Sequence, residues 1–175
     1  SLSHVQSIVE KKNTLPILSN ILIEAKDNFL VLSSTDMDIS ITDKISCSVV
    51  EEGSTTISAH TFYDIIRKLS DSSEIEIISN DGKIMTLRAG KSKFSLGCLP
   101  KEDFPLIEIG SLDNEISIDS KDLLKLLDKT RFAISNEETR YFLNGIYFHN
   151  ISKEDKNILS LVATDGHRLA KFDYF

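Results

Sequence analysis

The sequence predicts an α+β fold in which helices accompany antiparallel sheets, and three observations support that prediction. Apolar and polar side chains alternate with a period of two along residues 37–49, which is typical of one long strand, or a bent pair of strands, with one buried face. Three other stretches carry apolar residues at the spacing of an amphipathic helix. A motif near residue 18 recurs near residue 143, which indicates one fold used twice.

The composition narrows the class of protein. Of the 175 residues, 41% are hydrophobic and 27% charged, as expected for a soluble globular protein. The sequence has no apolar run near the ~18 residues of a membrane span and no secretory signal, and isolated Cys47 and Cys98 favour a reducing cytosol. The formal net charge of −7 argues at first sight against nucleic-acid binding. Because Ser1 is not a methionine and the apolar pattern continues to Phe175, we expect a fragment.

More strands are expected in the first half of the chain. Residues 74–78 and 83–88 flank Asn80-Asp81-Gly82, which is a hairpin signal. In a strand expected over 91–99, alternate apolar residues share one face, namely Phe94, Leu96 and Cys98. Together these segments predict an antiparallel meander with one solvated side.

Three helices are expected. The first two are marked by Leu2, Val5, Ile8 and Val9 and by Phe62, Ile65, Ile66 and Leu69. The third is capped by Ser120, and its apolar face consists of Leu123, Leu124, Leu126 and Leu127. A turn-rich stretch over 100–114 predicts a boundary between a domain at 1–113 and a partial second domain at 114–175.

The repeat is the most informative internal feature. Residues 18–23 (LSNILI) lead through a polar turn to Thr35-Asp36, and residues 143–148 (LNGIYF) lead to Thr164-Asp165. Since both copies contain the Thr-Asp pair, we assign it to the fold: a side-chain oxygen orders the turn that follows a strand.

The residues after the Thr-Asp pair differ between the copies. In the second copy, Gly166 permits an unusual backbone angle. His167 and Arg168 offer hydrogen-bond donors beside the apolar Leu169. This composition suits either a peptide-binding pocket or a charged strand edge, and the residues alone leave both open.

Most catalytic chemistry finds no support in the sequence. It has no pair of histidines at metal-ligand spacing, no CxxC, no glycine-rich phosphate loop and no GxSxG, so neither a metal nor a cofactor is expected. Asp36 and Asp38 share one face of a strand and, with His167, give a rival prediction of a metal-dependent hydrolase or nuclease. A solvated strand face explains the two aspartates more simply.

Cations recur on all three expected helices. The third helix carries Lys121, Lys125 and Lys129 at four-residue steps, the second carries Arg67-Lys68 near its end, and the first carries Lys11-Lys12. One such helix is ordinarily only a solvated face. Three of them on one surface would form a positive strip that attracts phosphates without reading bases.

Four segments together resemble the bacterial DNA polymerase III beta subunit, the sliding-clamp family. They are residues 15–20 (LPILSN), 94–105 (FSLGCLPKEDFP), 140–145 (RYFLNG) and 162–169 (VATDGHRL). The resemblance implies the DNA clamp (processivity) fold, with three similar domains per chain, two helices inside and sheets outside in each. Two chains close a ring. Against that pattern, the chain lacks the first strand, the rest of the second domain and the third domain.

The resemblance also implies a function without catalysis. A ring of this kind encircles duplex DNA without sequence specificity and tethers the replicative polymerase as a processivity factor. The implied partners are a second copy of the chain, the polymerase III alpha subunit, the clamp loader and other proteins that carry a clamp-binding motif, all in the cytoplasm and none at a membrane. A protein-interaction module with no DNA role is a second rival.

Three groups of site residues follow. To the helix cations Arg67, Lys68, Lys121, Lys125 and Lys129, the resemblance adds DNA-proximal positions at Lys12, His60, Glu137, Tyr141 and Phe142. His60 stands where the family often has arginine and Glu137 where glutamine is common, and both departures weaken the cationic character. The implied peptide pocket consists of Leu143, Thr164, Gly166, His167, Arg168 and Leu169, and the implied ring-closing edge of Lys91, Lys93 and Phe94.

Overall fold

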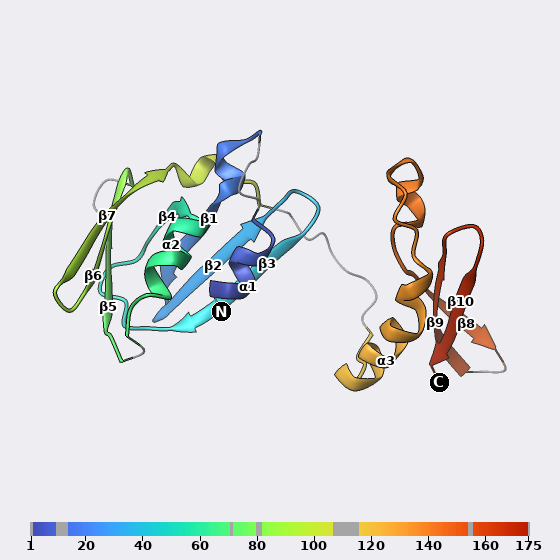
Figure 1. Cartoon of the computed structure of the whole chain (residues 1–175). Coiled ribbons are helices and arrows are strands. Elements are labelled where there is room, and N and C mark those ends of the chain that lie inside the picture. Colours follow the sequence, from blue (N-terminus) through green and yellow to red (C-terminus); the bar gives the residue numbers. More distant parts are fainter. Residues whose placement is uncertain are drawn as a thin grey trace. The chain divides into compact units, whose positions relative to one another are not determined.

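The computed structural model describes residues 2–9, 14–70, 72–79, 82–106, 116–153 and 156–174. The chain divides into two compact units, Ser1–Gly110 and Ser111–Phe175, each of which is considered by itself (Figure 1). Both contain helices and antiparallel strands, so the predicted α+β class is confirmed. The boundary expected between residues 113 and 114 lies outside the described residues.

Unit 1 is built on a seven-stranded sheet with the order β3-β2-β1-β4-β7-β6-β5. Its strands are β1 (Asn20–Lys26), β2 (Phe29–Thr35), β3 (Ser40–Ser46), β4 (Gly53–Ser58), β5 (Ile75–Ser79), β6 (Ile84–Ala89) and β7 (Ser92–Leu99). Its helices are α1 (Leu2–Ser7) and α2 (Ala59–Ile66), with the short 3-10 helices η1 (Pro16–Ser19) and η2 (Lys101–Asp103). The two α-helices contact each other and lie against the sheet (Figure 1).

The core of unit 1 lies between these helices and the sheet. Val5 of α1 and Phe62 of α2 are buried together with inward side chains of the strands, including Ile21, Ile57 and Leu87. The apolar spacing that predicts both helices therefore marks the faces that they bury.

The strand expected over residues 37–49 is shorter than the alternation suggests. Only β3 is a strand there, and its odd positions are half-buried while its even positions are exposed. Met37 and Ile39 belong instead to the turn before β3, where each is 54% exposed. The Thr-Asp pair bends the chain at this point and takes both side chains off the sheet.

The predicted hairpin and the last strand of the meander are confirmed. β5 and β6 pair antiparallel from Ile75 opposite Ala89 to Ser79 opposite Met85, and Gly82 in the connection has a φ of +68°. β7 follows and pairs with β6.

Thr56 joins the two parts of the sheet. β4 pairs with β1 along its length but meets β7 only at Thr56–Leu99 and Ile57–Cys98. The buried Thr56 hydroxyl donates to the carbonyl oxygen of Leu99 at 2.8 Å and accepts from Nδ2 of Asn20 at 3.0 Å. One hydroxyl thus links three strands where the backbone ladder is shortest.

Unit 2 repeats the first part of unit 1. It contains α3 (Ser120–Thr130), the 3-10 helices η3 (Arg131–Ala133) and η4 (Glu138–Leu143), and the strands β8 (Tyr147–Lys153), β9 (Lys156–Thr164) and β10 (Leu169–Tyr174). Its sheet order β10-β9-β8 matches the order β3-β2-β1 of unit 1, as the sequence repeat predicts. Its buried core is made of Leu126, Ala133, Ile158, Leu161, Ala163 and Ala170.

The third helix begins as expected but with a different cap. Asp119, not Ser120, is the N-cap residue, and its carboxylate accepts from the backbone N–H of Lys121 at 2.8 Å. Aspartate and serine both cap helices well, so the sequence alone could not show which of these two adjacent residues is the cap. The leucine face is also narrower than predicted, because Leu126 is buried but Leu124 is 61% exposed.

We expect Thr56→Val to destabilise unit 1 by about 1–3 kcal/mol. Valine has the shape of threonine but no hydroxyl, so the buried amide of Asn20 and the Leu99 carbonyl would each lose a hydrogen-bond partner. Urea denaturation would measure the change. The matched control is Thr86→Val on β6, a half-buried strand threonine whose hydroxyl has no hydrogen bond in the described structure. Equal losses in both variants would contradict the linking role.

Candidate functional site

The Thr-Asp turns of the two units have the same hydrogen bonds. The Thr35 hydroxyl donates to the carbonyl oxygen of residue 39 at 2.9 Å and accepts from the N–H of residue 37 at 3.0 Å. The Thr164 hydroxyl donates to the carbonyl oxygen of Arg168 at 2.7 Å and accepts from the N–H of Gly166 at 3.1 Å. The prediction that a side-chain oxygen orders this turn is confirmed.

The aspartates complete each turn. Oδ1 of Asp36 accepts from the N–H groups of Asp38 and Ile39 at 3.0 and 2.7 Å, and Oδ1 of Asp165 accepts from those of His167 and Arg168, both at 2.9 Å. The backbone N–H groups of Arg168 and His167, with the Arg168 guanidinium, lower the pKa of Asp165 to about 2. The N–H groups of Ile39 and Asp38 likewise lower the pKa of Asp36.

This geometry removes the basis of the hydrolase alternative. Each turn uses its aspartate to bind backbone donors, and the two turns lie in different units. Among the described residues, no group of three His, Cys, Asp or Glu side chains could hold a metal ion. The structure therefore does not support the rival prediction of a hydrolase or nuclease site made of Asp36, Asp38 and His167.

The turn of unit 2 gathers five of the six predicted pocket residues. Gly166 has a φ of +87°, the unusual angle expected of it. His167, Arg168 and Leu169 are exposed, and Leu169 is 65% accessible. Nε of Arg168 pairs with the Asp165 carboxylate at 2.9 Å, and its guanidinium carbon lies 5.8 Å from the Phe132 ring centre.

The sixth pocket residue, Leu143, ends the neighbouring η4 segment, and an arginine connects that segment to the turn. Nη1 of Arg140 donates to the carbonyl oxygen of Asp165 at 3.5 Å, while Nε pairs with Glu137 at 3.1 Å. Sequence reasoning missed Arg140. The repeat could have indicated it, because Arg140 occupies the position that is Leu15 in the first copy, so a charged residue replaces an apolar one there.

The lysines of α3 form an exposed cationic row. Lys121, Lys125 and Lys129 are exposed, and the structure shows no ion pair for any of them within its described ranges. The acids of the same helix are engaged elsewhere: Asp128 pairs with Arg131 at 3.3 Å, and Asp122 accepts from the Tyr174 hydroxyl at 3.1 Å and thereby raises the pKa of that tyrosine.

The other DNA-proximal candidates of unit 2 are also at the surface. Tyr141 and Phe142 are 78% and 71% exposed, and their rings meet edge to face with centroids 5.9 Å apart. Exposed aromatic rings of this kind can stack on nucleic-acid bases. Glu137 pairs with Arg140, which neutralises its charge locally.

The cationic candidates of unit 1 are more constrained. Nε of Arg67 pairs with Asp64 at 2.9 Å. Both ring nitrogens of His60 are bonded within the unit: Nδ1 lies 2.8 Å from Nε2 of Gln6, and Nε2 lies 3.1 Å from the carbonyl oxygen of Val9. His60 thus ties α2 to α1. Lys12 lies outside the described residues.

The predicted ring-closing edge coincides with an open strand edge and a pocket. β7 pairs with β6 from residue 92 to 97 but reaches β4 only at residues 98 and 99, so in the described part of the chain one edge of its first half lacks a strand. Lys91 and Lys93 are exposed there. A pocket of about 370 Å³ adjoins the edge and is lined by Thr61, Asp64, Ile65, Lys68, Leu69, Ser92 and Phe94.

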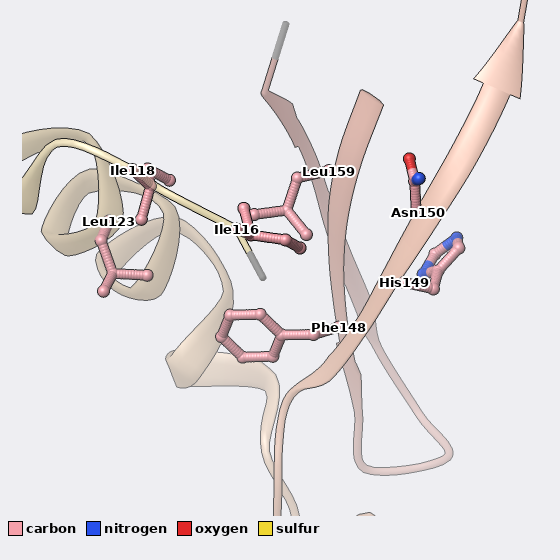
Figure 2. Close-up of a pocket in the computed structure, with 7 residues that line it drawn as sticks. All are labelled: Ile116, Ile118, Leu123, Phe148, His149, Asn150 and Leu159. Carbon is pink, nitrogen blue, oxygen red and sulfur yellow. The ribbon is translucent and has the colours of Figure 1, made fainter. Parts of the chain in front are cut away.

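Unit 2 holds a second, mostly apolar pocket, which the sequence did not indicate. It measures about 290 Å³ and is lined by Ile116, Ile118, Leu123, Phe148, His149, Asn150 and Leu159 (Figure 2). Nδ1 of His149 is buried without a hydrogen-bond partner among the described residues. The apolar side chains of this pocket come from α3, the segment before it, β8 and β9. Because tertiary packing brings these segments together, their sequence alone did not indicate the pocket.

Comparison with known proteins places both units in one family. Residues 1–108 match the family model for the DNA polymerase III beta subunit, N-terminal domain, and residues 117–173 match that for its central domain. The chain belongs to the DNA polymerase III beta subunit family. None of the described helices has the length and apolar character needed to cross a membrane.

Individual relatives agree with this family. The beta sliding clamp of Caulobacter vibrioides is 47% identical over 171 residues, covering 97% of this chain and 46% of the relative, and that of Rickettsia felis is 41% identical over 170 residues, covering 97% and 44%. A crystal structure of the Caulobacter crescentus clamp has a TM-score of 0.93 at 46% identity, covering 99% of this chain and 46% of that one. A Bartonella birtlesii clamp bound to griselimycin also scores 0.93, at 45% identity, with coverages of 99% and 46%. The chain spans about half the length of these relatives.

We expect the Asp165 carboxyl to titrate near pH 2 in an NMR pH titration, with the Asp165→Asn variant assigning its resonance. Because the folded-state pKa lies below the ordinary value of 3.8, ionised Asp165 stabilises the turn fully above pH 3.8, and this contribution is lost as the pH falls through about 2. The amide resonances of His167 and Arg168 should shift with the same midpoint. A midpoint near 3.8 would mean that the backbone donors do not hold the carboxylate in solution.

Proposed function

We propose that the chain is part of a beta sliding clamp, a ring-shaped processivity factor that encircles duplex DNA and tethers a replicative polymerase in the cytoplasm. The observation that carries the proposal is the match to beta sliding clamps along 97% of the chain at 47% identity. A tether acts through effective concentration, because a held polymerase rebinds faster than it diffuses away. Tethering requires shape and affinity, so the proposed role is non-catalytic and needs no cofactor.

Duplex DNA is the proposed ligand of the cationic side chains. Lys121, Lys125 and Lys129 are exposed on α3, with Nζ of Lys125 5.9 Å from the Phe172 ring centre, and Tyr141 and Phe142 add exposed aromatic rings to the same unit. Mobile cations attract phosphates, often through water, without reading bases, which allows sliding. Lys12, Arg67, Lys68, His60 and Glu137 complete this proposed set. His60 and Glu137 are its weaker members, since neither supplies the cation or amide common in the family.

A short peptide of a partner is the proposed ligand of the turn in unit 2. Leu143, Thr164 and Leu169 offer apolar contacts, while the exposed side chains of His167 and Arg168 offer hydrogen-bond donors beside Gly166. The backbone N–H groups of residues 166–168 are bonded within the turn, which fixes the positions of these side chains. Such a surface suits an extended segment with leucine or phenylalanine anchors. The proposed partners are the polymerase III alpha subunit, the clamp loader and other proteins with a clamp-binding motif.

A second copy of the chain is the proposed partner of the β7 edge. An unpaired strand edge offers backbone donors and acceptors to another strand. Phe94 adds an apolar anchor beside the adjoining pocket, and Lys91 and Lys93 supply positive charge. These features support a ring that closes through this edge.

For the DNA role, we expect neutralisation of Lys121, Lys125 and Lys129 to glutamine in the full-length protein to reduce polymerase processivity. If each lysine meets one phosphate, the salt dependence of log Kobs should flatten by about 2.7, at about 0.9 for each phosphate. The control replaces Lys26, Lys83 and Lys101, which are exposed residues of unit 1 outside the proposed contacts. Unchanged processivity and salt slope would favour an interaction module without a DNA role.

For the ring, we expect Phe94→Ala in the full-length protein to weaken self-association about tenfold, as loss of an aromatic interface anchor typically does. Sedimentation equilibrium would measure the dissociation constant. Ile41→Ala is the control, because Ile41 is half-buried on β3, which stands four places from β7 in the sheet order. Equal dissociation constants for both variants would place the self-association surface elsewhere.

A further inference from the structure

The two Thr-Asp turns have nearly the same backbone but different residues at the left-handed position. Met37 has a φ of +84° and Gly166 a φ of +87°. Unit 1 therefore shows that this turn can form with a side chain in place. The backbone angle favours glycine at position 166 but does not by itself require it.

A neighbouring side chain adds a second constraint. A Cβ added to Gly166 would lie 3.1 Å from Nη1 of Arg140, closer than ordinary van der Waals contact. In unit 1, the residue that corresponds to Arg140 is Leu15. Leu15 and Met37 of unit 1 thus correspond to Arg140 and Gly166 of unit 2. In unit 2, a long cationic side chain lies against a residue that has no side chain.

The guanidinium of Arg140 spans two segments of unit 2. Its Nε is held by Glu137 at 3.1 Å, and its Nη1 donates to the Asp165 carbonyl oxygen at 3.5 Å. The backbone of Arg140 departs from helical angles, with φ −116° and ψ 46°, within the η4 segment. A planar fork suits such a two-sided contact, whereas a lysine would supply only a point charge.

We propose that Arg140 is a positioning residue that holds the 164–168 turn from the η4 segment, and that Gly166, besides accepting the left-handed backbone angle, leaves room for the Arg140 guanidinium. The effect of Arg140 on peptide binding rests on the proposed function, in which the 164–168 turn binds a partner peptide. The turn carries Thr164 and Gly166 of that surface, and η4 carries Leu143. Arg140 therefore keeps the two parts of the surface in register.

A double-mutant cycle in the full-length protein tests this proposal. The variants are Arg140→Ala, Gly166→Ala and the two combined, and the probe is a fluorescent peptide with a leucine–phenylalanine pair. We expect each single variant to bind about tenfold more weakly and the double variant to lose less than the sum of the two losses, because without the guanidinium only the backbone angle disfavours the added methyl. Additive losses would overturn the proposal. Leu15→Ala is the matched control, because it truncates the corresponding position of unit 1 and should leave peptide affinity unchanged.

A second readout does not depend on any peptide. NMR should show the amide resonances of Gly166 and His167 shifted by Arg140→Ala, and by Arg140→Lys to a similar extent, since charge alone does not restore the fork. If wild-type protein bound no peptide but these shifts occurred, only the proposed function would fail. Unshifted resonances in Arg140→Ala would overturn the positioning role itself.

Discussion

Each unit depends on a constraint at one strand end, where the chain must reverse without losing its backbone hydrogen bonds. In each turn a threonine hydroxyl donates to a backbone carbonyl, and an aspartate carboxylate accepts from backbone N–H groups. The turn then sets the register of β2 with β3 and of β9 with β10. Because the side chains that make these bonds recur in both copies, the Thr-Asp pair is a property of the fold and leaves the following residues free to vary.

The distribution of charge matters more than its sum. The chain has a net charge of −7, yet the aspartates of α3 serve other groups: Asp119 caps the helix, Asp122 bonds Tyr174 and Asp128 pairs with Arg131. The lysines of the same helix therefore keep their charge for an external partner. Fields at a surface follow such local arrangements, so an acidic protein can present a cationic face.

Local signals were readable from the sequence, and features that depend on tertiary contacts were not. The β5–β6 hairpin and the Thr-Asp turn are encoded by a few adjacent residues, and both form as predicted. The exposure of Leu124 and the bonding of His60 to α1 depend on what packs beside each helix. Arg140 was missed for the same reason, since its role depends on a turn 25 residues away in sequence.

The two copies show how one backbone can carry different surfaces. At corresponding positions, unit 1 places Leu15 and Met37 at the surface, each about half exposed, whereas unit 2 places Arg140 and Gly166. The exchange leaves the turn hydrogen bonds intact but replaces two apolar side chains with a guanidinium that lies against a glycine. Since the fold is common to both, a difference in ligand arises from residues that differ between the copies. The proposed site therefore follows from the differences between the copies, and the architecture from their similarity.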